Sequence, residues 1–174
     1  STNPCGEQAL LPWEPCNLGS LNLSNFVQGE FLRGRLDFPR LKEAVADAIR
    51  FLDDVIDVNN YPLAEIETLA KGNRRIGLGV MGWAEALAKM GLAYDSPQAL
   101  AAAETVMSFV NGAALEASEA LARERGTFPN WADSVYDPAS PHYRGEARRP
   151  RHCARTTIAP TGTIAIAAGL QGGG

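Results

Sequence analysis

Three residues near the start of the chain, Asn3, Cys5 and Glu7, have side chains that can act together in bond-breaking chemistry. An amide, a thiol and a carboxylate stand at alternate positions, with Pro4 and Gly6 between them. In an extended loop, side chains at alternate positions project to the same side. The spacing therefore predicts that all three face one ligand, where Glu7 takes a proton from a substrate hydroxyl and Asn3 hydrogen-bonds a neighbouring one.

The same stretch has a simpler interpretation, a proline-rich loop with one buried thiol, because free cysteine commonly packs as a small apolar residue. Cys16 follows eleven residues after Cys5, in an alternating segment where a buried thiol is ordinary. Cys153 is predicted to be a buried small residue. His142, His152 and Cys153 lack the spacing of metal ligands, so no metal site is predicted.

The composition indicates an ordinary globular protein. The 174 residues are 45% apolar and 21% charged, and their net charge of −4 gives no general attraction to DNA or RNA. No apolar run reaches membrane-spanning length, and the first residues do not show the basic-then-apolar pattern expected of a leader. An odd count of three cysteines argues against a disulfide scaffold and favours a reducing, cytoplasmic setting. Both ends are expected to be cut from a longer chain, since a reactive loop begins at residue 3 and residues 170–174 are glycine-rich.

Helices and short strands are predicted to alternate, which indicates an α/β architecture. Alternating apolar and polar residues predict a strand over 16–23. A helix is expected from the N-cap Asp37 to about Asn59, and a shorter one over 62–70 ending near Gly72. Ser96 and Pro97 are a helix start signal, so a long helix is expected over 98–125, before Gly126. Its apolar stripe comprises Leu100, Val106, Phe109, Val110, Ala113, Ala117 and Leu121.

Two proline-containing segments are predicted to be irregular. Residues 8–15 are expected to form a loop that packs Leu10, Leu11 and Trp13 against the body. Residues 127–150 are interrupted by prolines, and Trp131 and Tyr136 are expected to anchor them.

Residues 77–82, Gly-Leu-Gly-Val-Met-Gly, match the G-x-G-x-x-G dinucleotide fingerprint, with Asp95 eighteen residues after the first glycine. That fingerprint needs an apolar strand before its first glycine, and a polar, basic joint precedes it here. A glycine-faced helix packed closely on a neighbour is the preferred interpretation. Two interpretations of Arg74 and Arg75 are open, contact with a phosphate or pairing with carboxylates, and pairing at the surface is preferred.

The segment Pro160-Thr161-Gly162-Thr163 is predicted to be a tight turn between a short strand over 156–159 and a short helix or strand over 164–168. Glycine exposes backbone N–H groups and the threonines add hydroxyls, so such a turn can cradle a phosphate. It lacks the lysine of a Walker loop, which argues against a nucleoside-triphosphatase motif.

Four segments together resemble the large chain of ribonucleotide reductases, in the family's order and spacing and across essentially all 174 residues. They are residues 3–8, 16–23, 74–82 and 157–164. The Pro-Cys-Gly-Glu-Gln run at 4–8 is most similar to class II, the adenosylcobalamin-dependent branch.

The resemblance implies that residues 1–174 are a partial catalytic barrel domain, from a ten-stranded α/β barrel whose central finger loop carries Cys5 at its tip. Cys5 would become a thiyl radical that abstracts the ribose 3′-hydrogen. Glu7 would take the 3′-hydroxyl proton and Asn3 would hold the reacting hydroxyls. Cys16 would be half of a redox-active dithiol, with its partner outside this chain. On this basis the isolated chain is expected to be inactive.

The resemblance also implies ligands and partners. The substrate is a ribonucleoside di- or triphosphate, and the cofactor is adenosylcobalamin, held mostly by residues outside this chain. A thioredoxin-like reductant and a homodimer of the parent protein are expected. The substrate-binding residues are Asn3, Pro4, Cys5, Gly6, Glu7, Pro160, Thr161, Gly162, Thr163 and Ile164.

Two alternatives remain beside this interpretation. One is a class I reductase, which receives its radical from a metal-containing partner subunit. The other is a non-catalytic phosphate- or nucleotide-binding module that uses only residues 160–164, and it predicts that Cys5 lies far from that turn. The catalytic interpretation predicts one nucleotide-sized cavity flanked by Cys5 and residues 160–163 and lined by Cys16.

Overall fold

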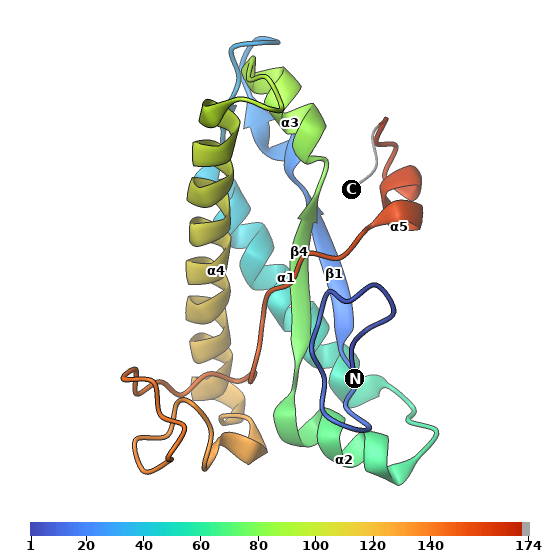
Figure 1. The fold of residues 1–174 in the computed structure, drawn as a ribbon, viewed down its shortest axis with the longest axis vertical. Helices are drawn as coiled ribbons and strands as arrows, with labels where there is room; N and C mark the ends of the chain where they lie inside the picture. Colours follow the sequence, from blue (N-terminus) through green and yellow to red (C-terminus); the bar gives the residue numbers. More distant parts are fainter. Residues whose placement is uncertain (172–174) are drawn as a thin grey trace.

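A parallel pair of strands, β1 (Asn17–Asn22) and β4 (Ile76–Met81), lies at the centre of the computed structural model, which describes residues 1–171 (Figure 1). Asn17 is paired with Ile76 and Asn22 with Met81. Parallel strands need a crossover connection, and here it contains helices α1 (Phe38–Val58) and α2 (Ala64–Asn73). The predicted α/β architecture is confirmed, whereas the glycine-rich end at 172–174 lies outside the described residues.

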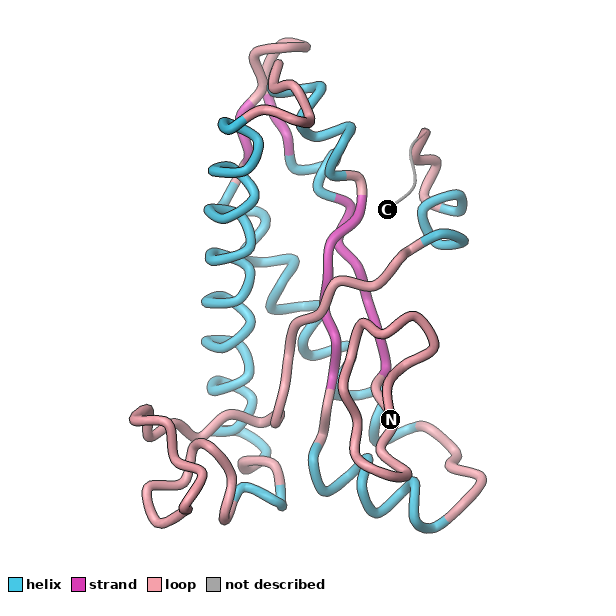
Figure 2. Tube along the Cα trace, in the orientation of Figure 1, coloured by secondary structure: helices cyan, strands magenta, loops and turns pink. Residues whose placement is uncertain are grey.

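The remaining elements are short except for one long helix, as the trace in Figure 2 makes plain. They are η1 (Leu23–Phe26), β2 (Val27–Gln28), β3 (Arg35–Leu36), α3 (Trp83–Met90), α4 (Pro97–Arg125), η2 (Pro129–Trp131) and α5 (Gly162–Ala167). No helix in this described part of the chain is both long and apolar enough to cross a membrane.

The two longest helices, α1 and α4, begin at the capping residues that the sequence predicts. The Asp37 side chain accepts a hydrogen bond from the Arg40 N–H at 3.0 Å, which caps the start of α1. The Ser96 hydroxyl oxygen accepts one from the Ala99 N–H at 3.1 Å, and Gly126 ends α4 with φ of 84°. The shorter helix α2 is also confirmed, displaced slightly toward the C-terminus relative to the prediction over 62–70.

Helices α1 and α4 form the main apolar core against the sheet. Phe38 and Phe109 meet edge to face, with ring centroids 4.8 Å apart. Leu100, predicted in the apolar stripe of α4, is instead 67% exposed. It precedes Val106 by six residues, a spacing that places the two on different faces of a helix. The fully or nearly fully buried residues include Leu41, Val45, Ile49, Leu52, Ile56, Ile76, Leu78, Val106, Val110 and Leu121.

The glycine-rich run is strand β4, so the predicted packing helix over 77–82 is wrong. Ile76, Leu78 and Val80 alternate with Gly77 and Gly79, which is the period of a strand. A Cβ on Gly77 would lie 2.6 Å from Leu18 Cδ2 and 2.7 Å from Thr157 Cγ2, and one on Gly79 would overlap the Thr157 carbonyl oxygen. The glycines therefore allow close approach of neighbouring chain segments, and not the binding of a dinucleotide.

Residues 154–157 run along the other side of β4. The Ile76 N–H donates to the Ala154 carbonyl at 3.2 Å, and the Leu78 N–H donates to the Arg155 carbonyl at 2.8 Å. The predicted strand over 156–159 is reduced to one parallel bridge, between Leu78 and Thr156. Because β1 lies on its other side, β4 is the central strand of this region.

The predictions for residues 127–150 are confirmed, whereas those for residues 8–15 are not all confirmed. Residues 127–150 are mostly irregular, as predicted, and Trp131 donates its ring N–H to the Arg148 carbonyl at 2.8 Å. Tyr136 lies edge-on to Phe128. In contrast, Leu11 and Trp13 are 53% and 59% exposed, so the predicted packing of these two residues is wrong, whereas Leu10 is partly buried.

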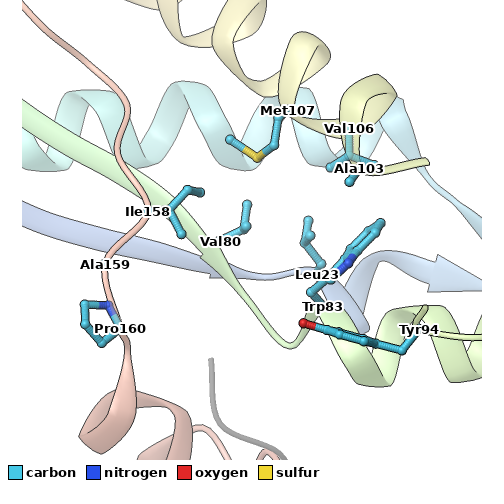
Figure 3. Close-up of a pocket in the computed structure, with 10 residues that line it drawn as sticks. All are labelled: Leu23, Val80, Trp83, Tyr94, Ala103, Val106, Met107, Ile158, Ala159 and Pro160. Atoms are coloured by element: carbon cyan, nitrogen blue, oxygen red, sulfur yellow. The ribbon is translucent and has the colours of Figure 1, made fainter. Parts of the chain in front are cut away.

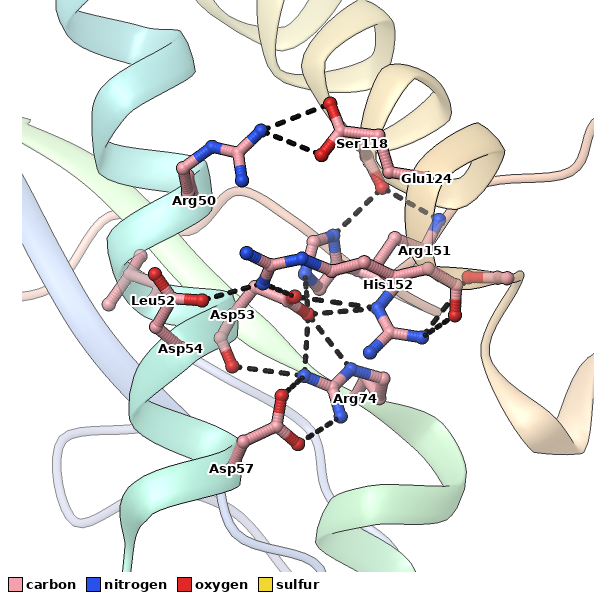
Figure 4. A network of polar contacts seen from close by, with 12 residues as sticks. Arg50, Leu52, Asp53, Asp54, Asp57, Arg74, Ser118, Glu124, Arg151 and His152 are labelled. Atoms are coloured by element: carbon pink, nitrogen blue, oxygen red, sulfur yellow. Dashed lines mark hydrogen bonds and ion pairs between the residues drawn. The ribbon is translucent and has the colours of Figure 1, made fainter.

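A buried carboxylate, Asp53 of α1, joins four parts of the chain (Figure 4). Its Oδ1 accepts from Arg74 Nε at 2.8 Å and from His152 Nε2 at 3.0 Å. Arg125 NH1 at the end of α4 donates to Oδ2 at 2.8 Å, and Arg151 Nε donates to Oδ1 at 3.2 Å. One anion thus connects α1, the end of α2, the end of α4 and residues 151–152.

Two of the groups around Asp53, Arg74 and His152, make further contacts that hold them in place. Arg74 has the left-handed φ of 48°, is 3% exposed, and also pairs with Asp57 at 2.8 Å. The predicted pairing of Arg74 with carboxylates is confirmed, but it occurs in the interior and not at the surface. His152 Nδ1 accepts from the Ser118 hydroxyl at 2.8 Å, which leaves the Nε2 proton for Asp53.

The close packing at Gly79 can be tested by adding one methyl group. Gly79→Ala should lower the free energy of unfolding by roughly 1–3 kcal/mol, because the Thr157 backbone must move. Gly112→Ala in α4 is the matched control, since nothing lies within 4 Å of its added Cβ; it should raise stability by about 0.5–1 kcal/mol. Urea unfolding followed by tryptophan fluorescence measures both. Equal stability of Gly79→Ala and the parent would contradict the close approach.

The Asp53 network should affect both the free energy of unfolding and the way in which that free energy depends on pH. Burial opposes ionisation of Asp53, but hydrogen bonds from His152 and Arg74 outweigh it and hold the pKa of this carboxyl well below its usual range. Asp53→Asn should cost roughly 3–5 kcal/mol near neutral pH, because the arginines lose their buried counter-charge. Asp54→Asn, whose carboxylate is half exposed and also contacts Arg125, should cost less than about 1 kcal/mol.

The sign of the pH effect follows from a pKa that is lower in the folded than in the unfolded state. The contribution of Asp53 is present above the unfolded value of about 3.9 and is lost as the pH falls toward the folded value. The stability difference between the parent and Asp53→Asn should therefore be constant from about pH 5 to 8 and narrow below about pH 4. A difference that stays unchanged down to pH 3 would show that ionisation of Asp53 is not the cause.

Candidate active site

Residues 1–10 form a small hairpin that carries Asn3, Cys5 and Glu7. Thr2 pairs with Ala9 in an antiparallel bridge, and the Asn3 N–H donates to the Gln8 carbonyl at 3.1 Å. The Gly6 N–H donates to the Asn3 carbonyl at 2.9 Å, which closes a turn over Pro4 and Cys5. The predicted extended conformation of this stretch is therefore wrong, because Pro4 and the positive φ of Gly6, 80°, suit a turn.

The turn nevertheless brings the thiol residue and the carboxylate together. Glu7 Oε2 accepts a hydrogen bond from the Cys5 N–H at 3.2 Å. Cys5 is exposed at the tip, Glu7 is partly buried, and Asn3 is buried at the base of the turn. The three residues are close because the chain turns here, and not because an extended chain points alternate side chains to one side.

The hairpin rests on the glycine-lined side of the sheet. The Thr157 hydroxyl donates to the Glu7 carbonyl, and the Thr157 methyl group lies where a side chain on Gly77 would otherwise be. Pro160 is three residues further along, which in extended chain is roughly 10 Å at about 3.3 Å per residue. The hairpin is thus attached directly to the segment that leads into the turn at 160–164.

Cys16 lies immediately before β1 and on the same side of the sheet. Its sulfur is 3.3 Å from the position that a Cβ on Gly77 would occupy, next to Thr157. Burial raises the pKa of the Cys16 thiol to about 12, although the Arg75 guanidinium opposes this shift. Cys16 is therefore a neutral thiol at physiological pH, connected to the hairpin through Gly77 and Thr157.

The tight turn predicted over 160–163 is only partly present, because α5 begins at Gly162 and includes its second half. Thr161 has φ of 57° and is 7% exposed, and α5 begins at Gly162. The first N–H groups of a helix have no partner within it, so those of residues 162–164 point outward from the first turn. Gly162, Thr163 and Ile164 are exposed.

The predicted residues line separate cavities of the described chain. Pro160 lines an apolar cavity of about 380 Å³, where Ile158 and Pro160 lie opposite Met107 of α4 (Figure 3). Cys16 lines a different cavity of about 150 Å³ with Arg75. Cys16 and Pro160 therefore line different cavities, whereas the prediction placed both at one cavity, and Cys5 is exposed at the hairpin tip.

Sequence reasoning overlooked Glu14, which attaches the hairpin to the body. Its carboxylate is fully buried and accepts from the Leu11 N–H at 2.9 Å, Asn73 Nδ2 at 2.6 Å and Arg75 Nε at 2.9 Å. The available signal was that Glu14 is the one charged residue within 8–15. Across residues 1–171, no group of three or more His, Cys, Asp or Glu side chains is placed to hold a metal ion.

Comparisons with known proteins identify the family of this chain. A family model described as "Ribonucleotide reductase, barrel domain" matches residues 1–173. The vitamin B12-dependent ribonucleoside-diphosphate reductase of Thermoplasma acidophilum is 51% identical over 172 residues, which are 98% of this chain and 21% of that protein. The protein of the same name from Mycobacterium tuberculosis H37Rv is 47% identical over 173 residues, 99% of this chain and 23% of the relative.

A more distant relative has a different name. The ribonucleoside-diphosphate reductase subunit alpha of Chlamydia trachomatis is 35% identical over 185 residues, 89% of this chain and 17% of that protein. The chain thus spans about a fifth of the length of the relatives it matches. Matched from residue 1 to residue 173, the chain belongs to the ribonucleotide reductase family and lies in its barrel domain.

Proposed function

We propose that residues 1–174 are part of the catalytic barrel of an adenosylcobalamin-dependent ribonucleotide reductase, which converts ribonucleotides to 2′-deoxyribonucleotides for DNA synthesis. The observation that carries the proposal is the hydrogen bond from the Thr157 hydroxyl to the Glu7 carbonyl. It attaches the Cys5 hairpin to the segment before the turn at 160–164. A phosphate-binding module without a catalytic thiol would not require this attachment.

The arrangement of layers supports a ten-stranded barrel with residues 1–10 as its finger loop. Strand β4 has parallel neighbours on both sides, and α1 and α4 cover one face. The other face is lined by Gly77 and Gly79 and carries the hairpin. In an α/β barrel, helices likewise lie outside the parallel strands.

In this proposal the chemistry takes place at the hairpin tip. Cys5, as a thiyl radical, abstracts the 3′-hydrogen of the ribose, while Glu7 accepts the 3′-hydroxyl proton and Asn3 hydrogen-bonds the reacting hydroxyls. The 2′-hydroxyl then leaves as water and hydrogen replaces it. Cys16 and a cysteine outside this chain supply the two hydrogens and two electrons, and are oxidised to a disulfide. The 3′-hydrogen returns from Cys5, so the thiyl radical is regenerated.

The substrate phosphates are assigned to residues 160–164. The outward N–H groups of the first turn of α5 and the Thr163 hydroxyl suit an anion. Ribonucleoside di- and triphosphates both fit this chemistry, and a thioredoxin-like protein would renew the dithiol of the parent homodimer.

The exposed position of Cys5 is compatible with a cofactor that generates a radical on its sulfur. The thiol is exposed, and no atom lies within 4 Å of the position of a Cβ on the neighbouring Gly6. This open tip lets a radical-generating group approach the sulfur, and adenosylcobalamin supplies such a radical when bound. The residues that hold the cofactor itself are expected mostly outside this chain.

The catalytic roles can be tested in the full-length protein. Cys5→Ser should abolish reduction, because a hydroxyl cannot replace the thiyl radical carrier. Glu7→Gln should slow turnover by roughly 10²–10⁴-fold, because proton transfer loses its base. Deoxyribonucleotide formation measures both, with circular dichroism as the test of folding. Cys153→Ser, the matched thiol control, should keep most of the activity, and an active Cys5→Ser enzyme would disprove the radical assignment.

The class II assignment makes a separate prediction about cofactor dependence. The 51% and 47% identities to the two proteins named B12-dependent, against 35% to the subunit alpha, favour it over class I. The full-length protein should reduce ribonucleotides with adenosylcobalamin and a dithiol as the only additions. Activity that requires a metal-containing partner subunit and is indifferent to adenosylcobalamin would favour the class I alternative.

A further inference from the structure

The buried Glu14 carboxylate joins the hairpin segment to the residues just before β4. It is the acceptor for one backbone N–H, from Leu11, and for side chains of Asn73 and Arg75. Glu14 also lies two residues before Cys16. A fully buried carboxylate needs such partners, because an uncompensated charge is costly to remove from water.

The cation of this pair lies beside Cys16. Asn17 and Ile76 are paired across the parallel strands, so the residues directly before them, Cys16 and Arg75, are neighbours where the strands begin. Both line the cavity of about 150 Å³. Arg75 also lines a second cavity, of about 450 Å³, together with Cys153. Arg75 therefore lines one cavity with Cys16 and another with Cys153.

Several charged or titratable groups act on the Cys16 thiol. Arg75 favours its thiolate form, whereas Glu14, Glu7 and Cys153 disfavour it. Tyr61 contributes a hydroxyl to the same cavity and donates it to the Ile56 carbonyl at 3.0 Å. Burial raises the pKa of Cys16 to about 12 and that of Cys153 to about 11, so both are neutral thiols near pH 7.

We propose that Glu14 and Arg75 are positioning residues for Cys16: Glu14 holds the guanidinium in place beside the thiol and compensates its charge, so that the cation does not promote the thiolate. The inference rests on the proposed function, in which Cys16 supplies a hydrogen to the sugar. An uncompensated cation beside a thiol would favour the thiolate, which has no hydrogen to supply. The ion pair thus provides attachment for the hairpin without activating the thiol as a nucleophile.

The two members of the pair should have opposite effects on Cys16. Glu14→Gln removes a negative charge, keeps the shape of the side chain, and leaves Arg75 uncompensated, so the thiolate becomes more favourable. Arg75→Gln removes the positive charge, so the thiolate becomes less favourable. A purely structural role predicts something different: either change would loosen the loop and make Cys16 more accessible.

The experiment measures alkylation of Cys16 in the reduced, full-length protein at pH 8, with iodoacetamide and mass spectrometry that assigns the labelled residue. A pKa change of about one unit alters the thiolate fraction about tenfold, and the opposite change in nucleophilicity reduces the effect on rate to roughly threefold. Cys16 should therefore be alkylated about threefold faster in Glu14→Gln than in the parent protein, and about threefold slower in Arg75→Gln. Acceleration in both variants, or no change in either, would overturn the proposal.

Three controls separate charge from folding. Arg75→Lys keeps the cation and should react within about twofold of the parent; a rate as low as that of Arg75→Gln would overturn the charge assignment. Glu67→Gln and Lys71→Gln alter an exposed ion pair on α2 and should leave the rate unchanged. Exposed Cys5 in the same sample is the reference thiol for reagent and pH. Since the assay needs no turnover, its result is independent of whether Cys5→Ser abolishes reduction.

Discussion

The ionised carboxylate of Asp53 is the interaction on which most of this arrangement depends. It has no contact with water and is compensated by guanidinium groups and an imidazole that come from distant parts of the sequence. Because Arg74 lies two residues before β4 and Arg151 three residues before residues 154–157, the same anion holds the chain close to the start of both segments. Their alignment brings Thr157 to the hairpin and Arg75 to Cys16. The site is therefore held in place from the opposite side of the sheet.

Local signals in the sequence were sufficient for the helices but not for the sheet. Asp37, the Ser96-Pro97 pair and Gly126 act on the backbone within a few residues, so their effect can be predicted without knowing the fold. The glycines of β4 act on chain segments about sixty and eighty residues away, at Leu18 and Thr157. Nothing near Gly77 reveals those partners, and the alternation with Ile76 and Leu78 was the one local indication of a strand.

In the candidate site, too, local features could be predicted from the sequence and long-range contacts could not. The order of residues at the hairpin tip predicted that Cys5 and Glu7 act together. In the structure the Glu7 carboxylate accepts a hydrogen bond from the Cys5 backbone N–H, within a turn and not along an extended chain. The buried partners of Glu14 and Asp53 were not predictable, because a single acidic residue in a sequence looks the same whether it faces water or an arginine. Leu11 and Trp13 illustrate the reverse error, since apolar residues were expected to attach a segment that is attached by a carboxylate.

The contact between Thr157 and the hairpin involves the backbone carbonyl of residue 7 and not its side chain. Attachment of the hairpin is therefore independent of which amino acid occupies this position. A substitution at residue 7 therefore leaves this contact available. The acid–base group at the tip and the attachment of the tip are separable properties of the same scaffold.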